Sequence, residues 1–311
     1  MEGEWFGTPA WNQHHMTMSR RFLAAGLVVL AGAVAGACPG ADGKAPLAGL
    51  PAGRPCGLGW DEAERVGKVP GRRREVSGFV ASDRRRNVAW MVRDSGNPAS
   101  LYSFEVDGDG QVTSSEFPVT GATNGDWEDV AYTAGNGTGH LWILDNINRH
   151  TSPKTIWEVA EPAPGHDGPA QLLGWYRWEY PDGNHDTETL FALDGRLVVL
   201  SKTAPSRAYV FDGPLLAGGL NRPRLLGEMA GPLLVLGSTS ADERLLLTSS
   251  TRTDTVYVTE IASGWTGATT PVFEHEMSAA QREAGDFFPA GGCDIILVDE
   301  RENIWRLRNE R

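Results

Sequence analysis

A repeated plan of short strands is the feature that most limits what this chain can fold into. Its clearest copy covers residues 124–132, where an acidic cluster runs into an alternating strand, followed by a Gly-rich turn and a second strand at 141–144. The same order of acidic start, strand, turn and strand recurs at 74–94 and at 185–202. Alternating apolar and polar residues mark half-buried strands, and no long window carries the 3.6-residue period of a helix. The repeat predicts an all-β fold built from equivalent sheets.

The spacing of the repeats indicates the architecture. The expected inner strands begin near Glu75, Trp127, Thr187, Leu233 and Asp286, at intervals of 52, 60, 46 and 53 residues. Four short strands and their loops fit such an interval, which is the size of a β-propeller blade. We therefore predict a single β-propeller of five blades, with six as the alternative if a further blade lies within residues 153–181.

We expect the N-terminal part of the domain to close the ring. The fifth blade lacks one strand, and residues 65–69 can supply it, which would remove two exposed sheet edges. Cys56 precedes that strand and Cys293 opens the second strand of the last blade. In an exported protein a remaining pair of cysteines favours a disulfide, with two buried free thiols as the alternative.

The first 60 residues have the pattern of an export signal and a tether. Residues 1–17 read as an over-extended start, and 18–37 as a signal peptide with a basic beginning and a short apolar run. Small residues then end at Cys38, which resembles the lipidated cysteine of bacterial lipoproteins. We expect 38–60 to be a lipidated tether and 61–311 the propeller domain. The protein is then exported and lipid-anchored to the cell envelope; a soluble secreted or periplasmic protein and a true membrane helix are the alternatives.

The net charge of the chain limits which binding partners are expected. The formal net charge is −12, and an acidic surface repels phosphate backbones and anionic headgroups. Nucleic acid is therefore not an expected partner, and the lipid anchor is the expected contact with membrane. We expect a monomer that binds a small molecule or an envelope protein.

Acidic residues gather where the strands start, which is one face of the predicted ring. The candidate metal ligands are Glu75, Asp126, Glu128, Asp129, Asp186 and Glu188. The ends of the second strands reach the same face and add Arg93, Asp94, Asp145, Asn146 and Lys202. Crowded carboxylates need a counter-charge, and Ca²⁺ accepts several oxygen ligands in loose geometry. The alternative is a set of solvated loop residues and strand caps.

Two further residues are candidates for catalysis on that face. His185 beside Asp186 has the pattern of a general base oriented by a carboxylate, and Lys202 suits an anionic substrate group. A hydrogen bond at the rim for His185 and salt bridges to neighbouring acids for Lys202 are the alternatives.

Three strings resemble a family of exported bacterial propeller proteins. They are residues 94–96, 123–131 and 180–190, which are similar to Asn-Asp-Ser-Gly, Asp-Trp-Glu-Asp-Ile-Ala and Tyr-Pro-Asp-Gly-x-His-Asp-x-Glu-Ala-Leu. Members of that family look distantly like phytase-like and gluconolactonase-type propellers, which implies Ca²⁺ in or beside the central channel. The resemblance covers about residues 75–200. In the later blades the family's acids are replaced, for example at Leu236-Gly237-Ser238.

Two functions follow as hypotheses. The first is a cell-envelope lipoprotein whose propeller is a binding or scaffold module, which the loss of the later acids favours. The second is a Ca²⁺-dependent hydrolase of a phosphate ester or lactone, which the acidic face and the resemblance favour. Fold alone does not separate the two.

Overall fold

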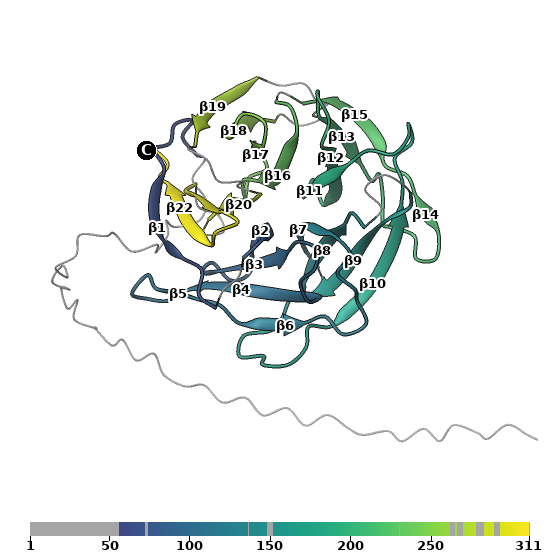
Figure 1. Ribbon diagram of the computed structural model, residues 1–311, viewed down its shortest axis with the longest axis horizontal. Coiled ribbons are helices and arrows are strands. Elements are labelled where there is room, and N and C mark those ends of the chain that lie inside the picture. The colour runs from purple at the N-terminus through teal and green to yellow at the C-terminus, as the bar shows by residue number, and fades with distance from the viewer. Residues whose placement is uncertain are drawn as a thin grey trace, which may run out of the picture. The chain divides into compact units, whose positions relative to one another are not determined.

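Five sheets stand around a common centre in the computed structural model (Figure 1). The structure describes residues 56–71, 74–135, 137–147, 152–229, 231–261, 265, 270–277, 283–288 and 293–310. The five-bladed propeller predicted from the repeat is confirmed. The predicted start, the signal peptide, Cys38 and the tether up to residue 55 lie outside the described residues. In the described part of the chain, no helix has the length and apolarity needed to cross a bilayer.

Each blade is a meander whose strands run in order from the centre outward. The inner strands are β2 (Val76–Ala81), β7 (Trp127–Ala134), β11 (Thr187–Leu193), β16 (Leu234–Thr239) and β20 (Ala284–Phe287). The second strands are β3 (Val88–Arg93), β8 (Gly139–Asp145), β12 (Arg196–Ser201), β17 (Leu245–Ser250) and β21 (Ile295–Val298). The third strands are β4 (Ser100–Val106), β9 (Lys154–Ala160), β13 (Arg207–Val210), β18 (Thr255–Glu260) and β22 (Asn303–Leu307). The outer strands are β5 (Val112–Thr113), β6 (Glu116–Pro118), β10 (Leu172–Trp178), β14 (Leu220–Asn221), β15 (Arg224–Glu228), β19 (Pro271–Glu276) and β1 (Glu64–Lys68).

The second blade settles the blade count. Residues 153–181 contain β9 and β10, which pair with each other as the outer strands of this blade. The short strand β14 returns from later in the chain and pairs with β10 in parallel. The length of this region thus extends an existing blade, and the alternative of six blades is wrong.

Apolar side chains on both faces of every blade hold the ring together. Alternate residues of one strand point to opposite faces of its sheet, and both faces meet a neighbouring blade. In β17, Leu246 therefore packs toward the third blade, while Leu245 and Leu247 pack toward the fifth. Five buried clusters fill the five gaps in this way. Burial on both faces explains why second strands such as β17 and β21 read as apolar runs without polar alternation.

The inner strands approach one another closely. A Cβ atom added at Gly78 of β2 would lie 2.7 Å from the Cα atom of Asp129 in β7. That distance is shorter than side-chain contacts allow, so glycine is required where these two strands meet.

The ring closes as predicted, through a strand from the front of the domain. Strand β1 pairs antiparallel with β22, so the first strand and the last three share one sheet. Cys56 and Cys293 form a disulfide with their Cα atoms 5.3 Å apart. The Trp60 indole N–H donates a hydrogen bond of 2.7 Å to the Cys293 carbonyl. Closure is therefore covalent as well as hydrogen-bonded.

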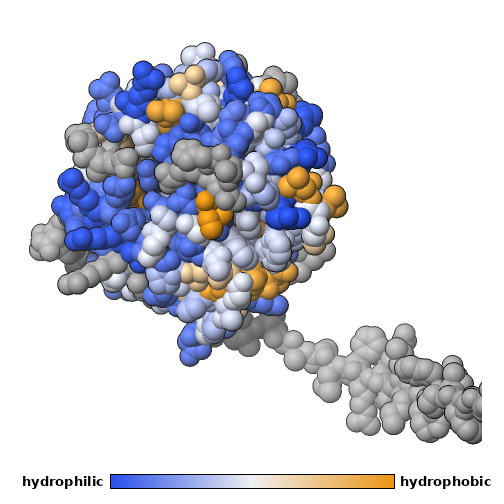
Figure 2. Space-filling view, turned by 45° about the vertical axis from the view of Figure 1, so that its right-hand side comes forward, coloured by the Kyte–Doolittle hydropathy of each residue, from blue (hydrophilic) through white to orange (hydrophobic). Residues whose placement is uncertain are grey.

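The outer side of the ring is mainly hydrophilic. Figure 2 shows separate small hydrophobic patches among hydrophilic residues on the side that carries β10, β14 and β15. Trp175, Leu216 and Leu225 are among the exposed apolar residues. Scattered residues of this kind are normal for a soluble surface and do not define a docking site.

Candidate functional site

Four inner strands have an irregularity in their pairing near their first residue. We call the side of the ring on which the inner strands begin the start face, and the opposite side the end face. The ladder skips one residue in each of these strands: Ser77, Glu128, Glu188 and Val235. A bulge of this kind re-aims the skipped side chain. Glu128 and Glu188 are buried there on the two strands that carry the acidic motifs.

The fifth blade contributes a glutamate at the same position, which the sequence motifs do not mark. At the end face, the backbone N–H groups of Ser82, Ser240 and Phe288 close their hairpins in the same way. Counting back five residues from each gives Ser77, Val235 and Glu283. Glu283 is therefore the counterpart of Glu128 and Glu188. Glu75, a predicted ligand, lies one residue before β2 and two residues before Ser77.

Lys202 balances part of this negative charge. Its ammonium forms an ion pair with the Glu188 carboxylate. Burial lowers the pKa of Lys202, but Glu188, helped by Glu283 and Asp186, outweighs burial, so the net shift is upward. Burial and the nearby Glu188 carboxylate raise the pKa of Glu283 to about 8, against the opposing effect of Lys202. The start face thus holds a cation and a carboxyl group that retains its proton near neutrality.

Three carboxylates from two blades meet at the start face. Asp94 follows β3, while Asp126 and Glu128 lie at the start of β7. One carboxylate oxygen from each lies within 4.8 Å of the other two. Asp126 and Glu128 are buried, and the Ser77 hydroxyl donates to Glu128 Oε2 over 3.3 Å. We call Asp94, Asp126 and Glu128 the acidic triad.

Asp129, a predicted ligand next to the triad, instead holds two blades together. Its Oδ1 atom accepts the N–H of Val130, and its Oδ2 atom accepts the N–H of Leu190 in the next blade, both over 2.8 Å. Burial raises its pKa well above the ordinary value. Asp286 of β20 does the same toward the first blade, where its Oδ2 atom accepts the Ala81 N–H over 2.6 Å. We call these two carboxyl groups the interblade clasps.

The remaining predicted ligands lie outside the triad. Asp186 accepts a 2.7 Å hydrogen bond from the Asn146 amide, and the fully buried Lys154 ammonium donates to the same Asn146 side chain. Glu75 accepts a 2.9 Å hydrogen bond from the Asn97 amide. Of the six predicted ligands, the structure places Asp126 and Glu128 together with Asp94. The other four predicted ligands form hydrogen bonds or ion pairs outside the triad; they are Glu75, Asp129, Asp186 and Glu188.

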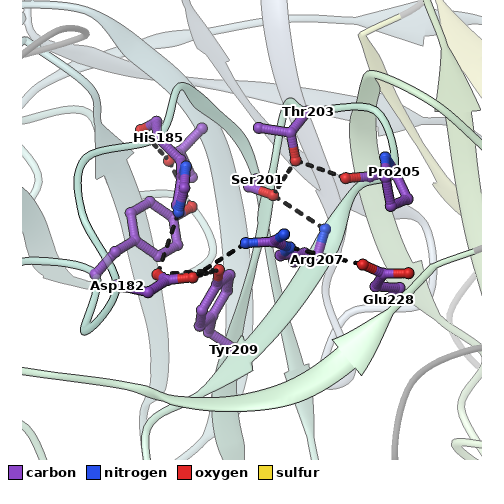
Figure 3. Close-up of polar contacts among 10 residues, drawn as sticks. Asp182, His185, Ser201, Thr203, Pro205, Arg207, Tyr209 and Glu228 are labelled. Atoms are coloured by element: carbon purple, nitrogen blue, oxygen red, sulfur yellow. Dashed lines mark hydrogen bonds and ion pairs between the residues drawn. The ribbon is translucent and has the colours of Figure 1, made fainter.

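His185 belongs to a separate network beside the third blade (Figure 3). Its Nε2 atom lies 3.1 Å from Asp182 Oδ1, whereas Asp186 was the expected partner. The Tyr209 hydroxyl donates to the same carboxylate over 3.0 Å, and Arg207 forms a 3.2 Å ion pair with it. None of the contacts in the described part of the chain joins His185 to Lys202. The two catalytic candidates thus have different partners.

The sheet order and the closing strand define the class of protein: a five-bladed β-propeller. No family model matches the chain, and no curated protein matches it in sequence. Among solved structures, the major Malassezia sympodialis allergen Mala s 1 is similar, with 7% identity, a TM-score of 0.50, and coverage of 80% of this chain and 96% of that one. The WD40 β-propeller domain of Doa1 has 10% identity, a TM-score of 0.45, and coverage of 80% and 98%. The β-propeller domain of Cps50 (Swd1) from Myceliophteria thermophila has 9% identity, a TM-score of 0.44, and coverage of 79% and 100%. At these identities the likeness concerns the fold alone.

Proposed function

We propose that this protein is an exported β-propeller, anchored through a lipid on Cys38, that binds Ca²⁺ at the acidic triad and presents the start face to a ligand. The observation that carries the proposal is the convergence of Asp94, Asp126 and Glu128 within 4.8 Å. The export and lipid parts depend on the sequence pattern of residues 18–38.

Calcium fits the triad in charge and spacing. Carboxylates held this close repel one another unless protons or a cation neutralise them. Ca²⁺ binds oxygens at about 2.3–2.6 Å, so oxygens on opposite sides of the ion lie about 5 Å apart. Its loose coordination also tolerates ligands from two blades, with water completing the shell.

A Ca²⁺-dependent hydrolase of a phosphate ester or lactone is the second candidate. The observation that favours it is Lys202 on the start face, where its ammonium suits an anionic group of a substrate. Glu283, with its raised pKa, is a proton donor near that ammonium. His185 supports this candidate less, because Asp182 holds it in another network. The binding module is therefore the main proposal.

The calcium proposal is tested with the purified domain. Metal content is measured first, and melting curves are then recorded with Ca²⁺ and with chelator. At a hundredfold excess over its dissociation constant, Ca²⁺ should stabilise the fold by about 2.7 kcal/mol. The variants Glu128→Gln and Asp94→Asn should lose most of that gain.

Asp109→Asn is the matched control, because Asp109 is an exposed carboxylate in a hairpin turn. It should keep the full Ca²⁺-dependent gain. A domain whose melting curve is the same in Ca²⁺ and in chelator does not have the proposed calcium site. Turnover of phosphate esters or lactones that Lys202→Met abolishes, with the Ca²⁺ gain intact, would favour the hydrolase.

A further inference from the structure

The end face of the ring opens into a cavity that the proposed calcium site does not use. Its volume is about 100 Å³, and all five inner strands contribute to its wall. Val80, Val130, Phe191 and Phe287 form the apolar part of that wall. At roughly 10–15 Å³ per water, the cavity has room for several waters or for a short aliphatic chain.

The charged side chains of the cavity are carboxylates, and the hydroxyl groups beside them already donate to other acceptors, as those of Ser238 and Ser240 do. Asp83 and Glu243 line it, and none of the residues that line it is Lys, Arg or His. Glu243 Oε2 accepts the Asp194 N–H over 2.9 Å. Burial and the nearby Glu161 carboxylate raise the pKa of Asp83. A ligand that brings donors and positive charge would therefore complement this cavity.

Asp286 lines the same cavity, but its oxygens are already used. The Ser238 hydroxyl and the Phe287 N–H donate to Oδ1, and the Ala81 N–H donates to Oδ2. Burial raises the pKa of Asp286 to about 7 and raises the pKa of Glu243 as well. For Glu243, the nearby Asp194 and Asp83 carboxylates add to this upward shift.

The spacing of these carboxylates favours an organic cation over a metal ion. Among the described residues, the acidic triad alone brings three carboxylate oxygens within 4.8 Å, and Asp83, Glu243 and Asp286 do not. An ammonium group reaches its acceptors through N–H bonds, at about 2.7–2.9 Å from nitrogen to oxygen, and so spans wider gaps than a bare ion. The apolar residues among those that line the cavity can contact methylene groups attached to that ammonium.

We propose that the cavity of the end face binds a primary alkylammonium group, with its nitrogen between Asp83 and Glu243 and its methylene chain against Val80, Val130, Phe191 and Phe287. This goes beyond the proposed calcium function and uses the opposite face of the ring. Two sources supply that chemistry: a free aliphatic diamine, or the side chain of a lysine on a partner protein.

The test uses 1,5-diaminopentane with the folded domain, followed by calorimetry and by chemical-shift changes. Saturable binding is expected, and pentanol and pentanoate should bind far more weakly. Asp83→Asn and Glu243→Gln should each weaken binding about tenfold or more, which is the usual loss for one charge-assisted hydrogen bond. Ala241→Trp places a bulky ring on an exposed residue at the cavity and should block binding while the domain stays folded.

Controls separate this proposal from the calcium site. Glu128→Gln and Asp109→Asn should bind the diamine as the wild type does. A lysine-containing peptide that binds more tightly than the diamine would identify a partner's side chain as the source, and the reverse order would identify a free amine. The proposal would be overturned if neither the diamine nor the peptide bound saturably, or if pentanol bound as tightly as the diamine. It would also be overturned if Asp83→Asn and Ala241→Trp both bound the diamine as the wild type does.

Discussion

Replacement of Asp129 tests whether this carboxyl group has a structural role while the neighbouring Glu128 binds metal. Asp129→Ala leaves two buried N–H groups without acceptors, those of Val130 and of Leu190 in the next blade. Each unsatisfied buried donor costs about 1–3 kcal/mol, so the expected loss in the free energy of unfolding is about 2–6 kcal/mol. Asp129→Asn keeps one acceptor oxygen and should lose about half as much.

The assay is urea unfolding followed by tryptophan fluorescence, with the disulfide intact. Asp286→Ala, in the other interblade clasp, should give a loss of similar size because it frees the Ala81 and Phe287 N–H groups. Asp109→Ala, at an exposed turn, should stay within about 0.5 kcal/mol of the wild type. In Asp129→Asn the stabilisation by Ca²⁺ should persist. A loss below 1 kcal/mol in Asp129→Ala, or a missing Ca²⁺ effect in Asp129→Asn, would refute this division of roles.

Three further predictions concern closure, pH and anchoring. Replacing both Cys56 and Cys293 by Ser should lower the free energy of unfolding in urea by about 5 kcal/mol, because the bridge spans a sequence separation of 237 residues. A loss below 1 kcal/mol would mean that strand pairing alone closes the ring. Burial raises the pKa of Asp286 from 3.8 to about 7, so its contribution to stability is complete below pH 4 and is lost as pH rises through 7, by about 4 kcal/mol in all. Asp286→Asn should therefore flatten the dependence of the unfolding free energy on pH between about 4 and 7, and an unchanged profile would contradict this. Cys38→Ser should move the mature protein from the membrane fraction to the soluble fraction, and wild-type protein that is already soluble and unacylated would exclude the lipid anchor.

Much of the fold could be predicted because strands and turns are local signals. Alternation, tight turns and repeat spacing predicted the inner strands and the closing strand, and the structure confirms both. The blade count stayed open because the length of residues 153–181 does not show which sheet they join. Pairing of β10 with β14, which lies more than 40 residues later, is a long-range contact without a local sequence pattern.

The site was harder to predict because a bulge decides where a side chain points. Glu128 and Asp129 are adjacent acids with opposite roles, and the irregularity between Trp127 and Asp129 separates them. Glu283 lacks the motif that marks the other two glutamates, so only its position in the ladder identifies it. In the first, fourth and fifth blades this position lies five residues before the residue whose N–H closes the end-face hairpin.

Because β1 shares one sheet with β20–β22, the ring can close only after the last strands have been synthesised. A ribosome adds about 5–20 residues per second, so β1 emerges about 10–50 seconds before β22 is complete. By the end of that interval four blades can form an open arc with two unpaired edges, while β1 still has no partner strand. The nascent chain therefore commits to its native state only when its final strands arrive. Chaperones have that period in which to engage a chain that is still incompletely folded.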